Sequence, residues 1–83
     1  MFDKPQALLE YLLRNLVTEK DKVEVIPEKD SFNRDILKVT VAKEDMGKII
    51  GKGGKTIRAI RNLIKVVAVK ESVHTSVILT EEY

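Results

Sequence analysis

The stretch "MGKIIGKGGKTIRAI", residues 46–60, contains every glycine of the 83-residue chain. Lysines are interspersed with these glycines, and the two residue types together are Gly47, Lys48, Gly51, Lys52, Gly53, Gly54 and Lys55. Apolar residues at helical spacing lie on both sides, which indicates two helices joined by a basic, glycine-rich turn. Such a turn holds a nucleotide, holds the backbone of a nucleic acid, or serves only as a structural connection.

The ending Gly54-Lys55-Thr56 also closes the nucleotide-binding P-loop, whose pattern is G-x-x-x-x-G-K-[ST] between a strand and a helix. The first glycine of that pattern would be residue 49, which is isoleucine, and the segment before the turn is predicted to be helical. The dinucleotide pattern G-x-G-x-x-G fails too, because Thr56 stands where its third glycine should be. The spacing therefore disfavours a nucleotide-binding loop.

The spacing that fits instead runs forward from Gly51 to Gly54 as a G-x-x-G turn. Glycines at these positions allow positive φ and remove side chains where another backbone must approach. The following helix starts near Lys55, so its free N–H groups favour an anion at the turn. Lys52 and Lys55 add positive charge at the same place, which suits a phosphodiester backbone.

The charge distribution agrees with this partner, although the net charge is only +2. Residues 43–70 contain eight Lys or Arg and two acidic residues, so this segment carries +6. Residues 1–42 carry seven basic and eight acidic residues (−1), and residues 71–83 carry three acidic ones (−3). A polyanion would be attracted to the middle segment, although a solvated basic helix face would have the same composition.

The composition argues against an enzyme and predicts no cofactor and no metal. The chain has no cysteine and a single histidine, His74, so neither a zinc site nor a catalytic set can be assembled. No apolar run approaches the roughly 20 residues of a membrane span. The N-terminus lacks the basic-then-apolar pattern of a secretory signal, so we expect a cytoplasmic protein without a membrane partner.

The hydrophobic periodicity predicts the order α-β-β-α-α-β. We expect a helix over 4–18, strands over 22–27 and 36–42, a short helix over 43–50, a helix from 55 to near 70, and a strand over 73–79. The short loop between the first two strands predicts an antiparallel pair. Glu44 and Asp45 fall in the first turn of the short helix, and Ile57, Ile60, Leu63, Ile64 and Val67 form one apolar stripe. The prediction is a single α+β domain over residues 1–83, with a three-stranded sheet and helices packed on one face.

The segment "IIGKGGKTI" resembles the (V/I)-I-G-x-x-G-x-x-I motif of KH domains, which bind single-stranded RNA or DNA. Ile49, Ile50, Gly51, Gly54 and Ile57 each fall on a motif position. The predicted element order is that of type II KH domains, and the chain resembles small bacterial RNA-binding proteins made of one such domain. The resemblance implies a groove that holds about four nucleotides of single-stranded RNA.

The resemblance also implies which residues contact RNA. The turn would clamp the RNA backbone, Ile50 would form part of an apolar groove floor, and Arg58 and Arg61 would extend the phosphate track. The expected RNA-binding residues are therefore Lys48, Ile50, Gly51, Lys52, Gly53, Gly54, Lys55, Arg58 and Arg61. The implied role is that of a post-transcriptional regulator or RNA chaperone.

An alternative is a protein–protein interaction or dimerisation module without nucleic-acid binding. Ile78 lies on the face of the last predicted strand opposite to Val77 and Leu79, and together with Val69 it suggests exposed apolar surface. The resemblance itself implies a homodimer and pairing with a larger, multidomain KH-containing RNA-binding protein. These interactions would add to RNA binding rather than exclude it.

Overall fold

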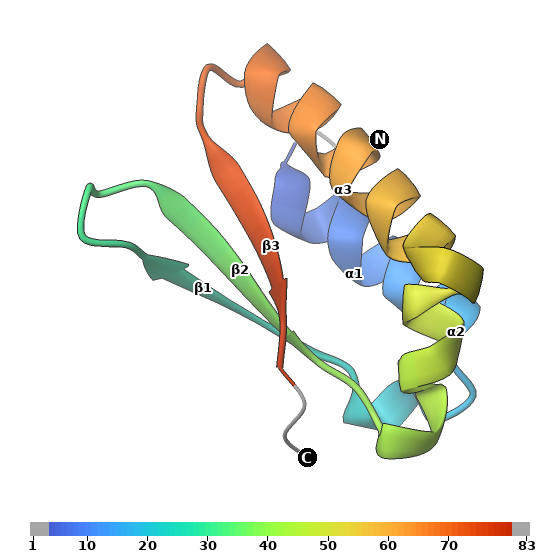
Figure 1. Cartoon of the computed structure of the whole chain (residues 1–83). Coiled ribbons are helices and arrows are strands. Elements are labelled where there is room, and N and C mark those ends of the chain that lie inside the picture. Colours follow the sequence, from blue (N-terminus) through green and yellow to red (C-terminus); the bar gives the residue numbers. More distant parts are fainter. Residues whose placement is uncertain (1–3, 81–83) are drawn as a thin grey trace.

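The computed structural model describes residues 4–80, whose elements follow the predicted order α-β-β-α-α-β (Figure 1). Their bounds are α1 (Pro5–Leu16), β1 (Glu24–Lys29), β2 (Asp35–Thr40), α2 (Met46–Ile50), α3 (Lys55–Lys70) and β3 (Thr75–Leu79). Pro5 occupies the first turn of α1, where its missing N–H costs nothing. The α+β class and the KH-type order of elements are confirmed.

The three strands form one mixed sheet in the order β1-β2-β3. The hairpin of β1 and β2 is antiparallel, as predicted, and β3 runs parallel to β2 after the crossover through α2 and α3. Figure 1 shows α1 and α3 side by side on the same face of the sheet, with α2 beyond one end of α3. The opposite face of the sheet carries no helix within the described residues.

The core lies between this helical layer and the sheet. Leu9 and Leu13 of α1 and Ile57, Ile60 and Ile64 of α3 are buried, as the periodicity predicted. They pack against the inward-facing side chains of the sheet, which are Val25, Leu37, Val39 and Val77. Leu63 is an exception, because its side chain lies outside the contact of α3 with the sheet and is 49% exposed.

Several element ends differ from the prediction for identifiable reasons. The first helix ends at Leu16 rather than at residue 18, because Val17 is extended. The first strand runs to Lys29 and contains Pro27 in its interior, since β1 is an edge strand and needs no donor on its free side. The last strand begins at Thr75, so His74 precedes the strand and does not lie on it.

The segment predicted as one helix over 43–50 is two elements. A 3₁₀ turn covers Lys43–Asp45, and α2 follows it as a short α-helix. A second 3₁₀ turn, Lys52–Gly54, joins α2 to α3 at the glycine-rich sequence. The second turn thus places the glycines between the end of α2 and the N-terminus of α3.

The two outer edges of the sheet differ. At the β1 edge, Pro27 has no N–H to offer, and the Val25 carbonyl accepts a long hydrogen bond of 3.5 Å from the Gln6 amide. At the β3 edge, the carbonyl of Val77 points towards α3, where it accepts a hydrogen bond from Arg61. The β3 edge is therefore the one that adjoins the basic helix.

Candidate nucleic-acid interface

The G-x-x-G sequence forms a tight turn with three left-handed glycines. Gly51 ends α2 with φ +76°, and its N–H donates to the Gly47 carbonyl over 2.8 Å. Gly53 and Gly54 have φ +64° and +77°, and the Gly54 N–H donates to the Gly51 carbonyl over 3.1 Å. These conformations strain any residue with a side chain, which explains why glycine recurs here.

The glycines of the turn face different surroundings. A Cβ on Gly51 would lie 2.2 Å from the Thr56 Oγ1, so the turn packs tightly against the start of α3 at this point. A Cβ on Gly53 would meet nothing within 4 Å. The turn is therefore closed at Gly51, which fixes its shape, and open at Gly53, where another molecule can approach the backbone.

Basic side chains surround the open part of the turn. Lys52 and Lys55 are exposed and make no ion pair within residues 4–80. Arg58 lies one turn further along α3, with its Nη1 3.3 Å from the place that a Cβ on Gly54 would occupy. Ile50, the last residue of α2, is partly exposed beside them. Positive charge, an accessible backbone and a small apolar surface thus meet at the N-terminus of α3.

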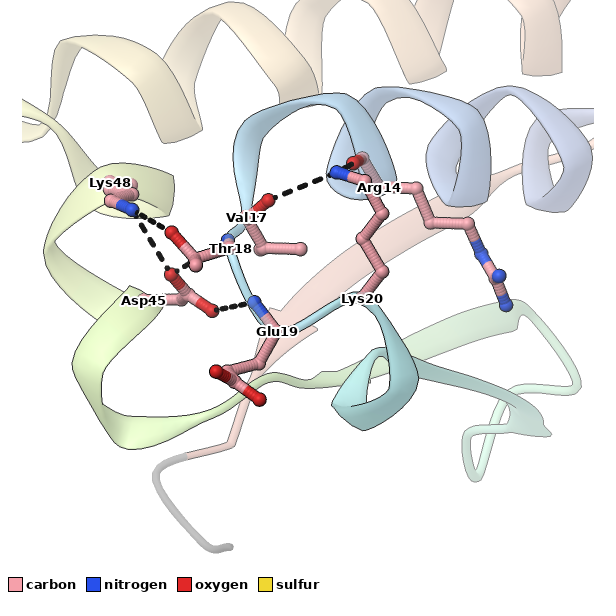
Figure 2. A network of polar contacts seen from close by, with 7 residues as sticks. All are labelled: Arg14, Val17, Thr18, Glu19, Lys20, Asp45 and Lys48. Carbon is pink, nitrogen blue, oxygen red and sulfur yellow. Dashed lines mark hydrogen bonds and ion pairs between the residues drawn. The ribbon is translucent and has the colours of Figure 1, made fainter.

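Lys48 lies on α2 but is engaged in a network of polar contacts (Figure 2). Its Nζ lies 3.4 Å from the Asp45 Oδ1 and also donates a hydrogen bond to the Thr18 hydroxyl. Half of its side chain remains exposed. Lys48 can therefore contribute charge to the turn, but its position is set by Asp45 and Thr18.

Asp45 is the centre of this network and is only 1% exposed. Its two carboxylate oxygens accept hydrogen bonds from the backbone N–H groups of Thr18 and Glu19, each over 3.0 Å. These two hydrogen bonds, with Lys48 beside them, hold the pKa of the Asp45 carboxyl below its ordinary value. Asp45 thus binds the loop after α1 to the start of α2, rather than serving only as a charge in a helical first turn.

The same loop is held from its other side by Lys20. Its Nζ donates to the Arg14 carbonyl over 2.6 Å and to the Val17 carbonyl over 3.2 Å, at the end of α1 (Figure 2). Sequence reasoning missed the Asp45 contacts because they join residues 26 and 27 positions apart in the chain, and it missed the local Lys20 contacts because no sequence pattern signals them. The effect of these contacts is to fix the helix that carries Lys48 and Ile50.

A cleft of about 460 Å³ runs between α3 and the free edge of β3. Arg61 crosses it, since its Nε donates to the Val77 carbonyl over 3.2 Å. The lining also includes Asn62, Lys65, Val69, His74 and Thr75. Lys65 was not among the predicted contacts, although its spacing from Arg58 and Arg61 along the helix is the signal that indicates a shared face.

The structure thus places the predicted residues in two groups. The turn and its immediate flanks bring together Lys48, Ile50, Gly51, Lys52, Gly53, Gly54, Lys55 and Arg58. Arg61 lies further along α3, in the cleft. Residues 4–80 contain no cluster of His, Cys, Asp or Glu that could hold a metal ion. None of the helices in this range is long and apolar enough to cross a membrane.

Comparison with known proteins gives consistent results. The sequence model of the family described as "KhpA/KhpB, KH domain" matches residues 6–79. The chain is 45% identical over 77 residues to the RNA-binding protein KhpA of Chlamydia trachomatis, covering 93% of this chain and 97% of that protein. It is 48% identical over 67 residues to KhpA of Clostridium acetobutylicum, covering 81% and 88% of the two chains. No solved structure matches the chain.

Proposed function

Because the chain belongs to the KhpA/KhpB family of KH domains, we propose that it binds single-stranded RNA at the G-x-x-G turn. The observation that carries this proposal is the open side of the turn at Gly53, which is flanked by the exposed Lys52 and Lys55. A phosphodiester backbone can approach the peptide backbone closely there and meets the N–H groups at the start of α3.

The bases then follow the cleft between α3 and β3. Its wall combines an aliphatic part, such as Val69, with the polar groups of Asn62 and Lys65. The lining of this cleft contains no Phe, Tyr or Trp, and its one aromatic ring is that of His74, so most of the bases rest on aliphatic side chains and backbone. Such contacts tolerate many sequences. Single-stranded DNA, which has the same backbone charge, is expected to bind in the same groove.

A charge reversal at the turn tests the proposal. Lys52→Asp combined with Gly53→Asp places two carboxylates where the RNA backbone is expected, and Asp tolerates a positive φ better than most residues. We expect RNA affinity to be lost while the unfolding midpoint stays within a few degrees. Arg14→Asp with Asn15→Asp is the matched control, since it makes the same change in net charge on α1.

Retained RNA binding by a folded turn variant would refute the role of the turn. Binding of ATP by the unmodified protein would favour the nucleotide-binding alternative instead. The salt dependence gives a second measurement. If three or four phosphates are engaged, the slope of log K against log salt should be about −2 to −3.

A second candidate function is pairing with another KH domain. Leu63, Val66 and Val69 lie on successive turns of α3 and are 49%, 65% and 67% exposed. A helix surface of this kind favours a homodimer, or a complex with a larger KH-containing RNA-binding protein. Val66→Glu should then shift the mass measured by light scattering from dimer to monomer without changing the unfolding midpoint by more than a few degrees.

We propose a binding protein rather than an enzyme, formed as one KH domain over residues 1–83. Its expected place of action is the cytoplasm, where single-stranded RNA is found. RNA binding that tolerates many sequences suits a post-transcriptional regulator or an RNA chaperone. Crosslinking of bound RNAs in cells would separate these roles, because a chaperone contacts many transcripts and a regulator contacts a defined set.

A further inference from the structure

The short helix α2 is held in place by contacts outside itself. It has five residues, and an isolated helix shorter than about 12 residues is marginal in water. Ile49 anchors it to the core and is completely buried. Its second anchor is a set of three residues, Thr18, Asp45 and Lys48, which we call the α2 clamp (Figure 2). The position of α2 therefore depends on the loop after α1 as well as on the core.

The three residues of the α2 clamp contact one another. The Asp45 carboxylate accepts a hydrogen bond from the Thr18 N–H, and the Lys48 ammonium donates a hydrogen bond to the Thr18 hydroxyl. The Lys48 Nζ also lies 3.4 Å from the Asp45 Oδ1. Removal of the Lys48 ammonium would leave Asp45 alone to hold the loop against α2.

The glycine-rich turn continues directly from α2. The Gly51 N–H donates to the Gly47 carbonyl inside α2, and the Gly54 N–H donates to the Gly51 carbonyl. A displacement of α2 is therefore passed to the backbone on the open side of the turn, at Gly53. A binding site needs its groups to be held within about 0.5 Å of the productive geometry. The contacts that hold α2 thus also determine how well the turn can bind.

The ammonium of Lys48 is already engaged in the α2 clamp. Asp45 is only 1% exposed, and its lowered pKa keeps its carboxyl ionised at neutral pH. If Lys48 turned to a phosphate, this buried carboxylate would lose its ion pair, which opposes the movement. Lys52 and Lys55 make no ion pair within residues 4–80, so no such loss opposes their contact with a phosphate.

We propose that Lys48 is a positioning residue for RNA binding and does not itself contact the RNA. Through Asp45 and Thr18 it holds α2, and with α2 the glycine-rich turn, in the geometry that the RNA backbone meets. The phosphate contacts of the turn then belong to Lys52 and Lys55. This inference rests on the proposed RNA binding, and it gives one of the residues expected to contact RNA a different role.

The salt dependence of RNA binding separates the two kinds of lysine. Lys48→Met and Lys52→Met remove the same charge from two exposed lysines near the turn. Lys52→Met should make the slope of log K against log salt shallower by about 0.7, the effect of one lost phosphate contact. Lys48→Met should keep the slope and weaken the affinity at every salt concentration by about 2- to 30-fold. An equally shallow slope in both variants would overturn the proposal, and so would an unchanged affinity of Lys48→Met.

Thr18 tests the α2 clamp without a change of charge. Thr18→Val removes the hydroxyl and should weaken RNA binding, whereas Thr18→Ser keeps the hydroxyl and should bind like the unmodified protein. Thr18→Val combined with Lys48→Met should bind no more weakly than Lys48→Met alone, because both changes break the same contact. Unweakened binding by Thr18→Val, or additive losses in the double variant, would overturn the proposal. Affinities are compared at a temperature where circular dichroism shows every variant to be folded.

Hydrogen exchange of the Gly54 N–H, measured by NMR without RNA, tests the α2 clamp independently of the proposed function. Exchange should be faster in Thr18→Val than in Thr18→Ser, because a loosened α2 weakens the hydrogen bond of this N–H to the Gly51 carbonyl. RNA binding by the unmodified protein with equal exchange in the two variants would overturn this inference alone. If the unmodified protein binds no RNA, the proposed function fails. Faster exchange in Thr18→Val would then still assign the clamp to the shape of the turn, and equal exchange would refute both.

Discussion

The Nε of Arg61 donates a hydrogen bond to the carbonyl oxygen of Val77 over 3.2 Å, which ties the middle of α3 to the free edge of β3. The Nη groups of the same guanidinium remain available to a phosphate. Arg61 therefore holds the cleft, and in the proposed complex with RNA its charge would have a second, separable role.

Replacement of Arg61 should separate these roles. Arg61→Ala removes both the hydrogen bond and the charge, so we expect a loss of about 1 kcal/mol in the free energy of unfolding. We also expect the slope of log K against log salt to become shallower by about 0.7. Arg61→Lys keeps the charge and should keep the slope. Equal slopes for all three proteins would show that Arg61 is only structural.

Two glycines of the turn should differ in their tolerance of alanine. Gly51→Ala combines a strained backbone with a clash against Thr56, so we expect it to cost about 3 kcal/mol or more in the free energy of unfolding. Gly53→Ala meets open space and should cost about 1 kcal/mol through its positive φ alone.

Urea denaturation of the two variants measures the difference. Gly53→Ala should also weaken RNA binding in a folded protein, since its methyl group would lie where we propose that the RNA backbone approaches. Similar free energies of unfolding for the two variants would contradict the finding that the turn is closed at Gly51 and open at Gly53.

Gly47 lies inside α2 and should be replaceable. A Cβ there would meet nothing within 4 Å, so close helix packing does not require the glycine. Gly47→Ala is expected to raise the free energy of unfolding by about 0.5–1 kcal/mol, the difference between the two residues in a helix. Thermal unfolding measures the gain. A gain in stability accompanied by a loss of RNA affinity would assign Gly47 to the groove instead.

Asp45 should make the stability depend on pH in acid. Its pKa is lowered in the folded protein, so its contribution is complete above the ordinary value of 3.8 and is lost as the pH falls through the lowered value. Asp45→Asn places an N–H group against the backbone N–H of Thr18 or Glu19. We expect a midpoint lower by roughly 5–15 °C at neutral pH.

The same variant should lose less stability than the unmodified protein when the pH is lowered from 5 to 2. Asp30, whose pKa is also lowered, chiefly by the Arg34 N–H, titrates in the same direction. Asp30→Asn should therefore also reduce the loss of stability in acid, and comparing the two variants divides that loss between Asp45 and Asp30. If the free energy of unfolding falls by the same amount between pH 5 and pH 2 in the unmodified protein and in Asp45→Asn, then Asp45 does not cause the loss of stability in acid.

The sequence predicted correctly those parts of the fold that depend on residues close together in the chain. The G-x-x-G turn, the end of α2 at Gly51 and the start of α3 at Lys55 follow from glycine conformation and helical periodicity, and the structure has them as predicted. The antiparallel hairpin followed in the same way from a short polar loop.

Contacts between distant segments could not be predicted. Asp45 looked like a charge at the start of a helix, because the Thr18 N–H that it binds is 27 residues away. Leu63 fits the apolar periodicity of α3, but periodicity does not tell how wide a stripe the sheet covers. Arg61 was expected on the phosphate track, and its bond to Val77 depends on where the last strand is placed.

The unequal edges of the sheet have a consequence for self-assembly. Pro27 and the Gln6 contact leave the β1 edge unsuited to accept another strand, so a sheet could be extended only from β3. Two copies that joined through their β3 edges would each present a blocked β1 edge outwards. Edge-to-edge pairing of sheets between molecules would therefore stop at a pair and could not propagate into a fibre.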